Sequence, residues 1–187
     1  MEIGADHWLR PARHCPSPNC NPRPANGGEI GLLVIHGISL PPAEFGGPWI
    51  DRLFTNNLPV DYHPYFATIA ALTVSAHVLI RRDGEIVQYV PFDLRAWHAG
   101  QSCYQGRENC NDFSIGIELE GTDDIPYEQA QYEQLANVIA ALHQRYPATI
   151  GHLVGHSDIA PGRKTDPGEV FSWDTLQQLL HDFEAVR

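Results

Sequence analysis

Residues 155–168 read GHSDIAPGRKTDPG, and the rest of the chain is organised around this loop. It contains one histidine, two carboxylates and two basic residues, interleaved with two prolines and three glycines. Proline stiffens the backbone and glycine permits tight turns, so the loop can hold His156 and Asp166 in a fixed relation. Both residue types bind zinc, and a catalytic zinc site usually takes three protein ligands and leaves a position for water. The loop therefore predicts two ligands and requires a third from elsewhere.

The third ligand is expected at the end of an earlier strand. Residues 31–36, GLLVIH, form an apolar run bounded by glycines, which is typical of a buried central strand. His36 would then lie at the carboxyl end of that strand, where α/β sheets place their ligands. A lone histidine there is more often a structural group, but His156 and Asp166 supply partners for it. Together the three residues would hold one Zn²⁺, which lowers the pKa of its water to about 7 and polarises a carbonyl.

The clearest alternating stretch of the chain is residues 113–121, FSIGIELEG. Its two isoleucines and Leu119 would face one way, and Glu118 the other. A carboxylate in the middle of a core strand needs a reason, because burying it unpaired is costly. We predict that Glu118 is the general base, which takes a proton from water and passes it to the leaving amine. A structural carboxylate paired with an arginine is the alternative.

Four further side chains are candidates for the same site. Lys164 lies two residues before Asp166, so its charge would be close to the metal and suited to stabilising an oxyanion; an exposed lysine is the alternative. Tyr65 would donate a phenol hydrogen bond to the same oxyanion. Trp97 and His98 place a flat ring beside a hydrogen-bonding ring, which suits a sugar or a peptide, although a buried tryptophan is the simpler interpretation.

The remaining patterns outline the fold. Apolar spacing predicts helices over 48–54 and 132–146 and a last helix capped by Ser172. Strands over 75–80 and 86–90 would form a hairpin around an Asp-Gly turn. We interpret residues 61–66 as a loop and residues 1–28, which are rich in Pro, Asn, Arg and Gly, as an irregular arm packed on the domain.

Composition limits the class of protein. A chain of 187 residues with 43% hydrophobic content is expected to form one domain with a real core. Its net charge of −11 argues against nucleic acid or an anionic membrane as partner. No run is long enough to cross a bilayer and the N-terminus lacks a secretory signal pattern, so we expect a cytoplasmic protein. The four cysteines lack Cys-x-x-Cys spacing and are expected to be free thiols.

These motifs resemble the zinc-dependent 1,6-anhydro-N-acetylmuramyl-L-alanine amidases, within the wider group of phage lysozyme-like amidases and peptidoglycan recognition proteins. The segments that carry the resemblance are residues 33–36, 38–42, 63–66, 95–100, 110–122 and 163–168. The resemblance implies a single α/β domain over residues 1–187, with a mixed central β-sheet flanked by α-helices. It also implies hydrolysis of the amide between the lactyl group of anhydromuramic acid and L-Ala of the stem peptide. That activity recycles cell-wall fragments in the cytoplasm and removes muropeptides that signal β-lactamase induction.

The same resemblance implies roles for individual residues. One zinc ion per chain would be held by His36, His156 and Asp166, with Glu118 and Lys164 catalytic and Tyr65 nearby. The candidate substrate contacts are Trp97, His98, Gly37 and Leu119. The implied partner is a small anhydromuropeptide bound by a monomer, with neither nucleic acid nor membrane.

The chain departs from the family pattern at positions that bear on substrate affinity. Gly37 stands where an asparagine is expected, and Thr73 and Asn109 stand where arginines that bind peptide carboxylates are expected. The main alternative function is a binding module of the same fold that holds peptidoglycan without cleaving it. Such modules lose metal ligands, whereas this chain has all three candidates. A secreted amidase and another zinc hydrolase, such as a deacetylase, are further alternatives.

Overall fold

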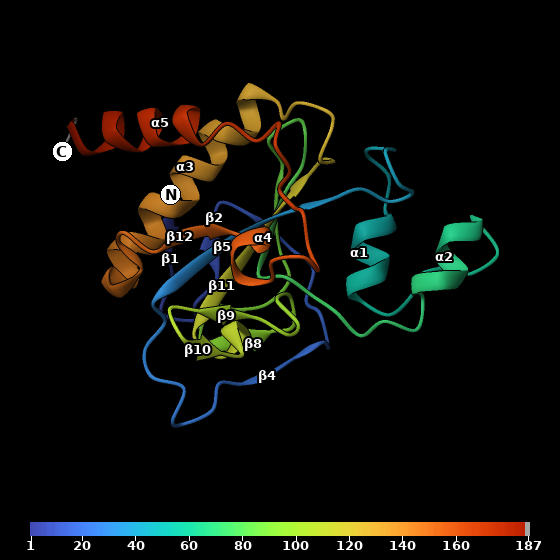
Figure 1. The fold of residues 1–187 in the computed structure, drawn as a ribbon, viewed down its shortest axis with the longest axis horizontal. Helices are drawn as coiled ribbons and strands as arrows, with labels where there is room; N and C mark the ends of the chain where they lie inside the picture. Colours follow the sequence, from blue (N-terminus) through green and yellow to red (C-terminus); the bar gives the residue numbers. More distant parts are fainter. Residues whose placement is uncertain (186–187) are drawn as a thin grey trace.

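A six-stranded mixed sheet forms the centre of the computed structural model, which describes residues 1–185 (Figure 1). In spatial order its strands are β12 (Leu153–Gly155), β5 (Leu32–Ile38), β11 (Ser114–Glu120), β6 (Val78–Ile80), β7 (Ile86–Gln88) and β3 (Arg13–His14). The first four run parallel, and β7 returns antiparallel to β6. The mixed α/β sheet and the hairpin around the Asp-Gly turn are thus confirmed.

The register of the central strands places the site. Strands β5 and β11 pair over seven residues, and Glu118 lies directly opposite His36. Strand β12 pairs with the other edge of β5 and ends with Gly155 opposite Ile35, so His156 follows at the same level. Because these three strands are parallel, their carboxyl ends meet at one edge of the sheet. Residues more than 100 positions apart are therefore neighbours.

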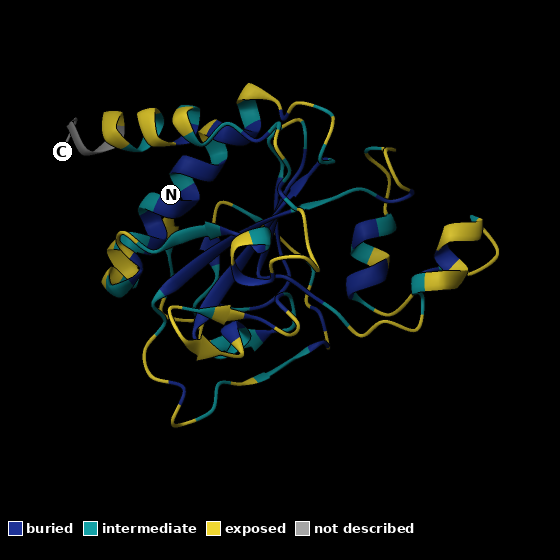
Figure 2. Ribbon diagram, in the orientation of Figure 1, coloured by how far each residue is buried: buried dark blue, intermediate teal, exposed yellow. Residues whose placement is uncertain are grey.

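Two helices cover one face of the sheet. Helices α3 (Gln129–Arg145) and α5 (Trp173–Ala185) pack on the face formed by the alternate side chains of β5 and β11 (Figure 1). A capping box between Glu128 and Gln131 starts α3, and Ser172 Oγ accepts a hydrogen bond from Thr175 N (3.2 Å) at the start of α5. Figure 2 shows the sheet and the inner side of α3 buried, with the outer side of α5 exposed. Both helices confirm the prediction.

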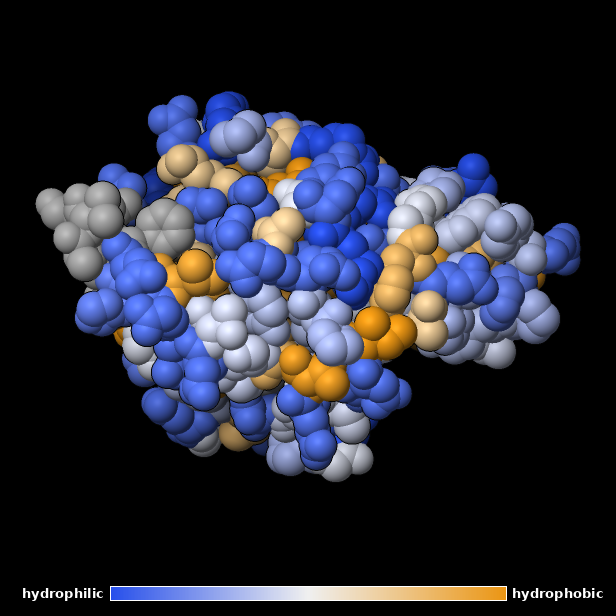
Figure 3. All heavy atoms as spheres, turned by 90° about the horizontal axis from the view of Figure 1, so that it is seen from above, coloured by the Kyte–Doolittle hydropathy of each residue, from blue (hydrophilic) through white to orange (hydrophobic). Residues whose placement is uncertain are grey.

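A small lobe stands beside the sheet. It contains α1 (Trp49–Phe54), as predicted, and α2 (Pro64–Ile69). The interpretation of residues 61–66 as a loop was wrong from Pro64 onward. Proline suits the first helical turn, and the His63 side chain caps the helix by accepting a hydrogen bond from Tyr65 N (3.2 Å). Figure 3 shows hydrophobic atoms along the border between this lobe and the main body.

The N-terminal arm is more regular than predicted. It contains β1 (Glu2–Ile3), β2 (Leu9–Arg10), β3 and β4 (Cys20–Pro22). Strand β3 joins the central sheet beside β7, and β4 pairs with β8 (Leu94–Ala96). Strands of two or three residues carry no readable alternation, and the partners of β3 and β4 lie some 70 positions away, so no local pattern marked them.

The remaining elements are short. Strands β9 (Cys103–Tyr104) and β10 (Arg107–Glu108) form a small hairpin, followed by the 3₁₀ turns η1 (Cys110–Asp112) and, after α3, η2 (Pro147–Thr149). The four cysteines are free, as predicted. None of the helices within residues 1–185 is both long and apolar enough to span a bilayer.

Candidate metal centre

Three side chains converge at the carboxyl edge of the sheet. His36 Nδ1 lies 2.9 Å from His156 Nδ1 and 3.2 Å from Asp166 Oδ2, and His156 Nδ1 lies 3.0 Å from the same oxygen. Both imidazoles are buried and Asp166 is mostly so. Within residues 1–185 this is the one group of three or more potential ligand side chains with converging donor atoms. The structure thus brings together the three residues predicted as metal ligands.

The outer nitrogens of the two imidazoles already have partners. His156 Nε2 lies 3.1 Å from the Ala99 carbonyl, to which it can only donate, so Nδ1 is the ring nitrogen that would bind a metal. His36 Nε2 lies 2.9 Å from His98 Nδ1. Burial lowers the pKa of His36 to about 4, so its ring is neutral at pH 7. Two imidazoles and a carboxylate converging on one point are a donor set that fits Zn²⁺.

The carboxylate of Asp166 is ionised in this setting. Burial opposes its ionisation, but the contacts with the His156 and His36 rings outweigh burial and hold the pKa of Asp166 well below its usual range. Its charge is therefore available to a cation at neutral pH. A site of two neutral rings and one carboxylate would leave a bound Zn²⁺ with one net positive charge.

The loop that supplies two of these residues is folded by its own backbone. Residues His156–Ile159 form a one-turn helix, α4, so the interpretation of this stretch as purely a loop was incomplete. Asp158 Oδ2 accepts a hydrogen bond from Gly155 N (2.7 Å) and so holds the start of that turn. Ser157 N donates to the Asp166 carbonyl (3.0 Å), which ties the two candidate ligands of the loop together. The fixed relation between His156 and Asp166, which we expected from the prolines and glycines of the loop, is thus maintained by hydrogen bonds.

Gly37 gives space to a tyrosine. A Cβ at Gly37 would lie 2.4 Å from Tyr127 Oη, which is closer than nonbonded atoms approach. That hydroxyl donates a hydrogen bond to the Pro167 carbonyl (2.9 Å), next to Asp166. The glycine found where an asparagine was expected therefore accommodates a buried phenol that holds the ligand loop.

Glu118 is buried without a partner. Its side chain is 9% exposed, and Oε2 has no hydrogen-bond partner among the described residues. Burial raises the pKa of Glu118 well above its usual range; the nearby Asp166 adds to this and Lys164 opposes it. The alternative of a carboxylate paired with arginine describes Glu120 instead, which lies 3.4 Å from Arg81 and accepts a hydrogen bond from Gly46 N.

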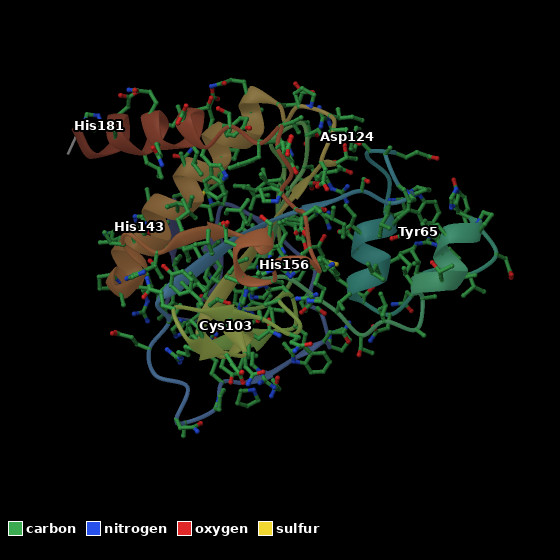
Figure 4. The ribbon with its side chains drawn as sticks, in the orientation of Figure 1. Tyr65, Cys103, Asp124, His143, His156 and His181 are labelled. Carbon is green, nitrogen blue, oxygen red and sulfur yellow. The ribbon has the colours of Figure 1, made fainter. Side chains whose placement is uncertain are left out.

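The candidate residues share one cleft of about 270 Å³. The three candidate ligands and Glu118 line it together with Trp97 and His98. Lys164 projects from the ligand loop, and Tyr65 reaches the cleft from α2. In Figure 4, Tyr65 lies on the lobe and His156 in the main body, so the cleft runs between the two parts. Apolar side chains line the rest: Ile38, Leu40, Leu53, Phe54, Ile69, Leu72 and Val74.

Two sequence interpretations need adjustment here. Leu119 is fully buried in the core beneath α3, so its side chain is not available to substrate and the structure contradicts that prediction. Side chains alternate along a strand, so the residue after Glu118 necessarily faces away from the cleft. Sequence reasoning also missed Ser114, which contacts His98 at 3.1 Å. The signal was present as Gly116, because a glycine within a core strand marks the close approach of another group.

The burial of Glu118 predicts a pH-dependent cost in stability. At pH 7.5 we expect Glu118→Gln to raise the free energy of unfolding of the metal-free protein by about 1–3 kcal/mol, because it removes an unsatisfied buried carboxylate. The folded-state pKa lies above the ordinary value of 4.5, so the protonated carboxyl stabilises the fold fully below that value, and this stability is lost as pH rises through the folded pKa. Urea unfolding with chelator should therefore show the gain at pH 7.5 and little near pH 4. An equal difference at both pH values would contradict it.

Comparison with known proteins places the chain among amidases. Residues 26–169 match the family model described as N-acetylmuramoyl-L-alanine amidase. The 1,6-anhydro-N-acetylmuramyl-L-alanine amidase AmpD of Enterobacter cloacae is 63% identical over 173 residues, which is 92% of each chain. The crystal structure of a selenomethionine derivative of AmpD superposes with a TM-score of 0.93 at 62% identity, and covers 96% of this chain and 99% of that one.

A more distant structure contains a ligand. It is the complex of the amidase AmiD from Escherichia coli with anhydro-N-acetylmuramic acid-L-Ala-D-γ-Glu-L-Lys, described as its substrate. The TM-score is 0.58 at 32% identity, with 84% of this chain and 60% of that chain covered. The fold that carries the candidate metal centre is therefore shared with proteins named as amidases.

Proposed function

Because this chain belongs to the N-acetylmuramoyl-L-alanine amidase family, we propose that it uses one zinc ion, held by His36, His156 and Asp166, to cleave anhydromuropeptides. The bond is the amide between the lactyl group of 1,6-anhydro-N-acetylmuramic acid and L-Ala of the stem peptide. The family matches confirm the resemblance drawn from the motifs, and they identify the chain as an amidase rather than a binding module.

One observation carries this proposal: a metal-type donor set and an unpartnered buried carboxylate open onto the same cleft. Glu118 and His36 are register neighbours on parallel strands, so their side chains lie on the same face of the sheet. Leaving a carboxylate buried without a partner costs stability. A carboxylate that is left unpartnered at a cleft, beside three converging ligands, is typical of a catalytic base rather than of a structural acid.

The residues divide the reaction among them. A bound zinc ion supplies a Lewis acid that polarises the scissile carbonyl and acidifies water. Glu118, in its ionised form, accepts a proton from the attacking water and later donates it to the departing L-Ala nitrogen. The exposed Lys164 lines the same cleft, where its ammonium would stabilise negative charge that develops on the carbonyl oxygen. Tyr65, which lines the same cleft, would donate to that oxygen from α2.

The walls of the cleft fit the rest of the substrate. Trp97 is half-buried, and its Nε1 donates to Asn21 Oδ1 (2.7 Å), so the ring is held in one orientation beside the cleft. We propose that this ring packs against the sugar or the lactyl methyl group. Among the described residues, Lys164 is the one lysine or arginine that lines the cleft. Thr73 and Asn109, which stand where arginines were expected, are uncharged and do not line it. We propose that the enzyme works as a monomer in the cytoplasm on recycled wall fragments, and thereby limits β-lactamase induction.

Mass spectrometry of anhydromuropeptide digests tests the bond and the metal together. Purified protein with zinc should release free stem peptide with L-Ala at its N-terminus, together with anhydro-N-acetylmuramic acid. Chelator should stop this release, and added zinc should restore it. Intact substrate under both conditions would overturn the proposed activity. Equal release with and without chelator would remove zinc from the mechanism.

A further inference from the structure

His98 touches a candidate ligand on one side and a buried serine on the other. Its Nδ1 lies 2.9 Å from His36 Nε2, and its Nε2 lies 3.1 Å from Ser114 Oγ. The rings of His36 and His98 meet edge to face, at an interplanar angle of 85°. Ser114 is fully buried at the start of β11, four residues before Glu118 on the same face. Both nitrogens of His98 are therefore committed within the protein.

The strand beneath His98 makes room for this arrangement. A Cβ at Gly116 would lie 2.4 Å from His98 Cγ and 2.5 Å from its Nδ1. Any other residue at this position would push the ring away from His36. Gly116 N in turn donates to His77 Nδ1 (3.0 Å), so the backbone at this point is held from the other side as well. The contact between His98 and His36 thus depends on a glycine in the middle of a core strand.

We propose that His98 and Ser114 form a hydrogen-bonded relay that stabilises the tautomer of His36 with its proton on Nε2, the form that leaves Nδ1 free for a metal. The relay rests on the metal site of the proposed function. A metal at His36 Nδ1 requires the proton on Nε2, and that N–H needs an acceptor. His98 accepts it at Nδ1, which leaves its own proton on Nε2, and that N–H donates to Ser114 Oγ. Each ring stays neutral, and each ring N–H of the relay has one acceptor.

This assignment gives His98 a role other than direct substrate contact. In His156, the ring nitrogen away from the metal site donates to a backbone carbonyl, which can only accept a hydrogen bond. In His36, the partner of that nitrogen is a ring that can either donate or accept, and a metal at His36 Nδ1 would select the form in which His98 Nδ1 accepts. His98 is a positioning residue that acts through His36, and Ser114 supports it by accepting from His98 Nε2.

Zinc affinity of matched variants tests the relay. Partners that orient metal-bound histidines typically contribute about 10–100-fold to metal affinity. We expect His98→Leu, which removes the acceptor, to weaken zinc binding by about that factor, and Ser114→Ala to weaken it at the lower end of the range. His98→Gln retains an oxygen that can accept from His36 and should recover most of the loss. His77→Gln is the control, because His77 is fully buried and lies against the His98 ring but has no hydrogen bond to a candidate ligand.

Chelator competition on proteins verified as folded by circular dichroism gives these affinities. Nuclear magnetic resonance of ¹⁵N-labelled histidines in the zinc-loaded protein should place the proton of His98 on Nε2. A folded His98→Leu variant with wild-type zinc affinity, or a His98 proton on Nδ1, would overturn the relay. If the wild-type protein binds no zinc at all, the proposed function fails first, so the two failures are distinguishable.

Discussion

Glu118→Ala is expected to lower kcat by about two to four orders of magnitude while about one zinc ion per chain remains bound. The structure separates the two properties because Glu118 lies beside the three candidate ligands but is not one of them. Its Oε2 atom has no hydrogen-bond partner in the described part of the chain, so its removal breaks no structural contact. Metal content by elemental analysis and kcat on a purified anhydromuropeptide measure the two effects separately.

Glu120→Gln provides the matched control for this loss. Glu120 lies two positions further along the same strand and on the same face, but its carboxylate is bound to Arg81 and to Gly46 N. We expect that variant to lose stability and to keep its turnover per folded molecule. Near-normal kcat in Glu118→Ala would remove Glu118 from the mechanism. A loss of zinc in Glu118→Ala would show instead that the carboxylate helps to hold the metal.

Asp166→Ala is expected to abolish zinc binding and to reduce activity to background. Loss of a partner that merely orients a ligand costs about 10–100-fold in metal affinity, so loss of a ligand itself should exceed the upper end of that range. Asp166 is the one anion among the three candidate ligands, and without it two neutral imidazoles would face the cation alone. Equilibrium dialysis against ⁶⁵Zn, followed by the amidase assay with excess zinc, measures both consequences.

Asp158→Ala tests whether this loss is specific to the ligand. Asp158 lies in the same loop, where its carboxylate accepts a hydrogen bond from Gly155 N and does not belong to the converging group. We expect a destabilised but zinc-binding enzyme, because only the cap of the one-turn helix is lost. Retention of zinc at wild-type affinity by Asp166→Ala would refute the assignment of this residue as a ligand.

The local parts of the fold were readable from the sequence. The apolar run that ends in His36, the alternation around Glu118 and the helical spacing of residues 132–146 each depend on neighbours within one strand or helix. Hydrophobic periodicity reports such neighbours directly. The helix from Pro64 onward was not predicted, because its start depends on a histidine side-chain cap. The strands of the N-terminal arm were not predicted either, because they depend on pairing partners far along the chain.

The residue types of the site were also readable, but their relations were not. Sequence alone identified a histidine and an aspartate in one loop, a histidine after a strand and a carboxylate in a core strand. Only the parallel register brought Glu118 opposite His36 and excluded Leu119, whose side chain points into the core. Only their partners in the folded chain distinguished the unpartnered Glu118 from the arginine-bound Glu120, two residues apart in one alternating pattern. Side-chain chemistry belongs to single residues, whereas proximity, tautomer and desolvation belong to pairs that meet only after the sheet has formed.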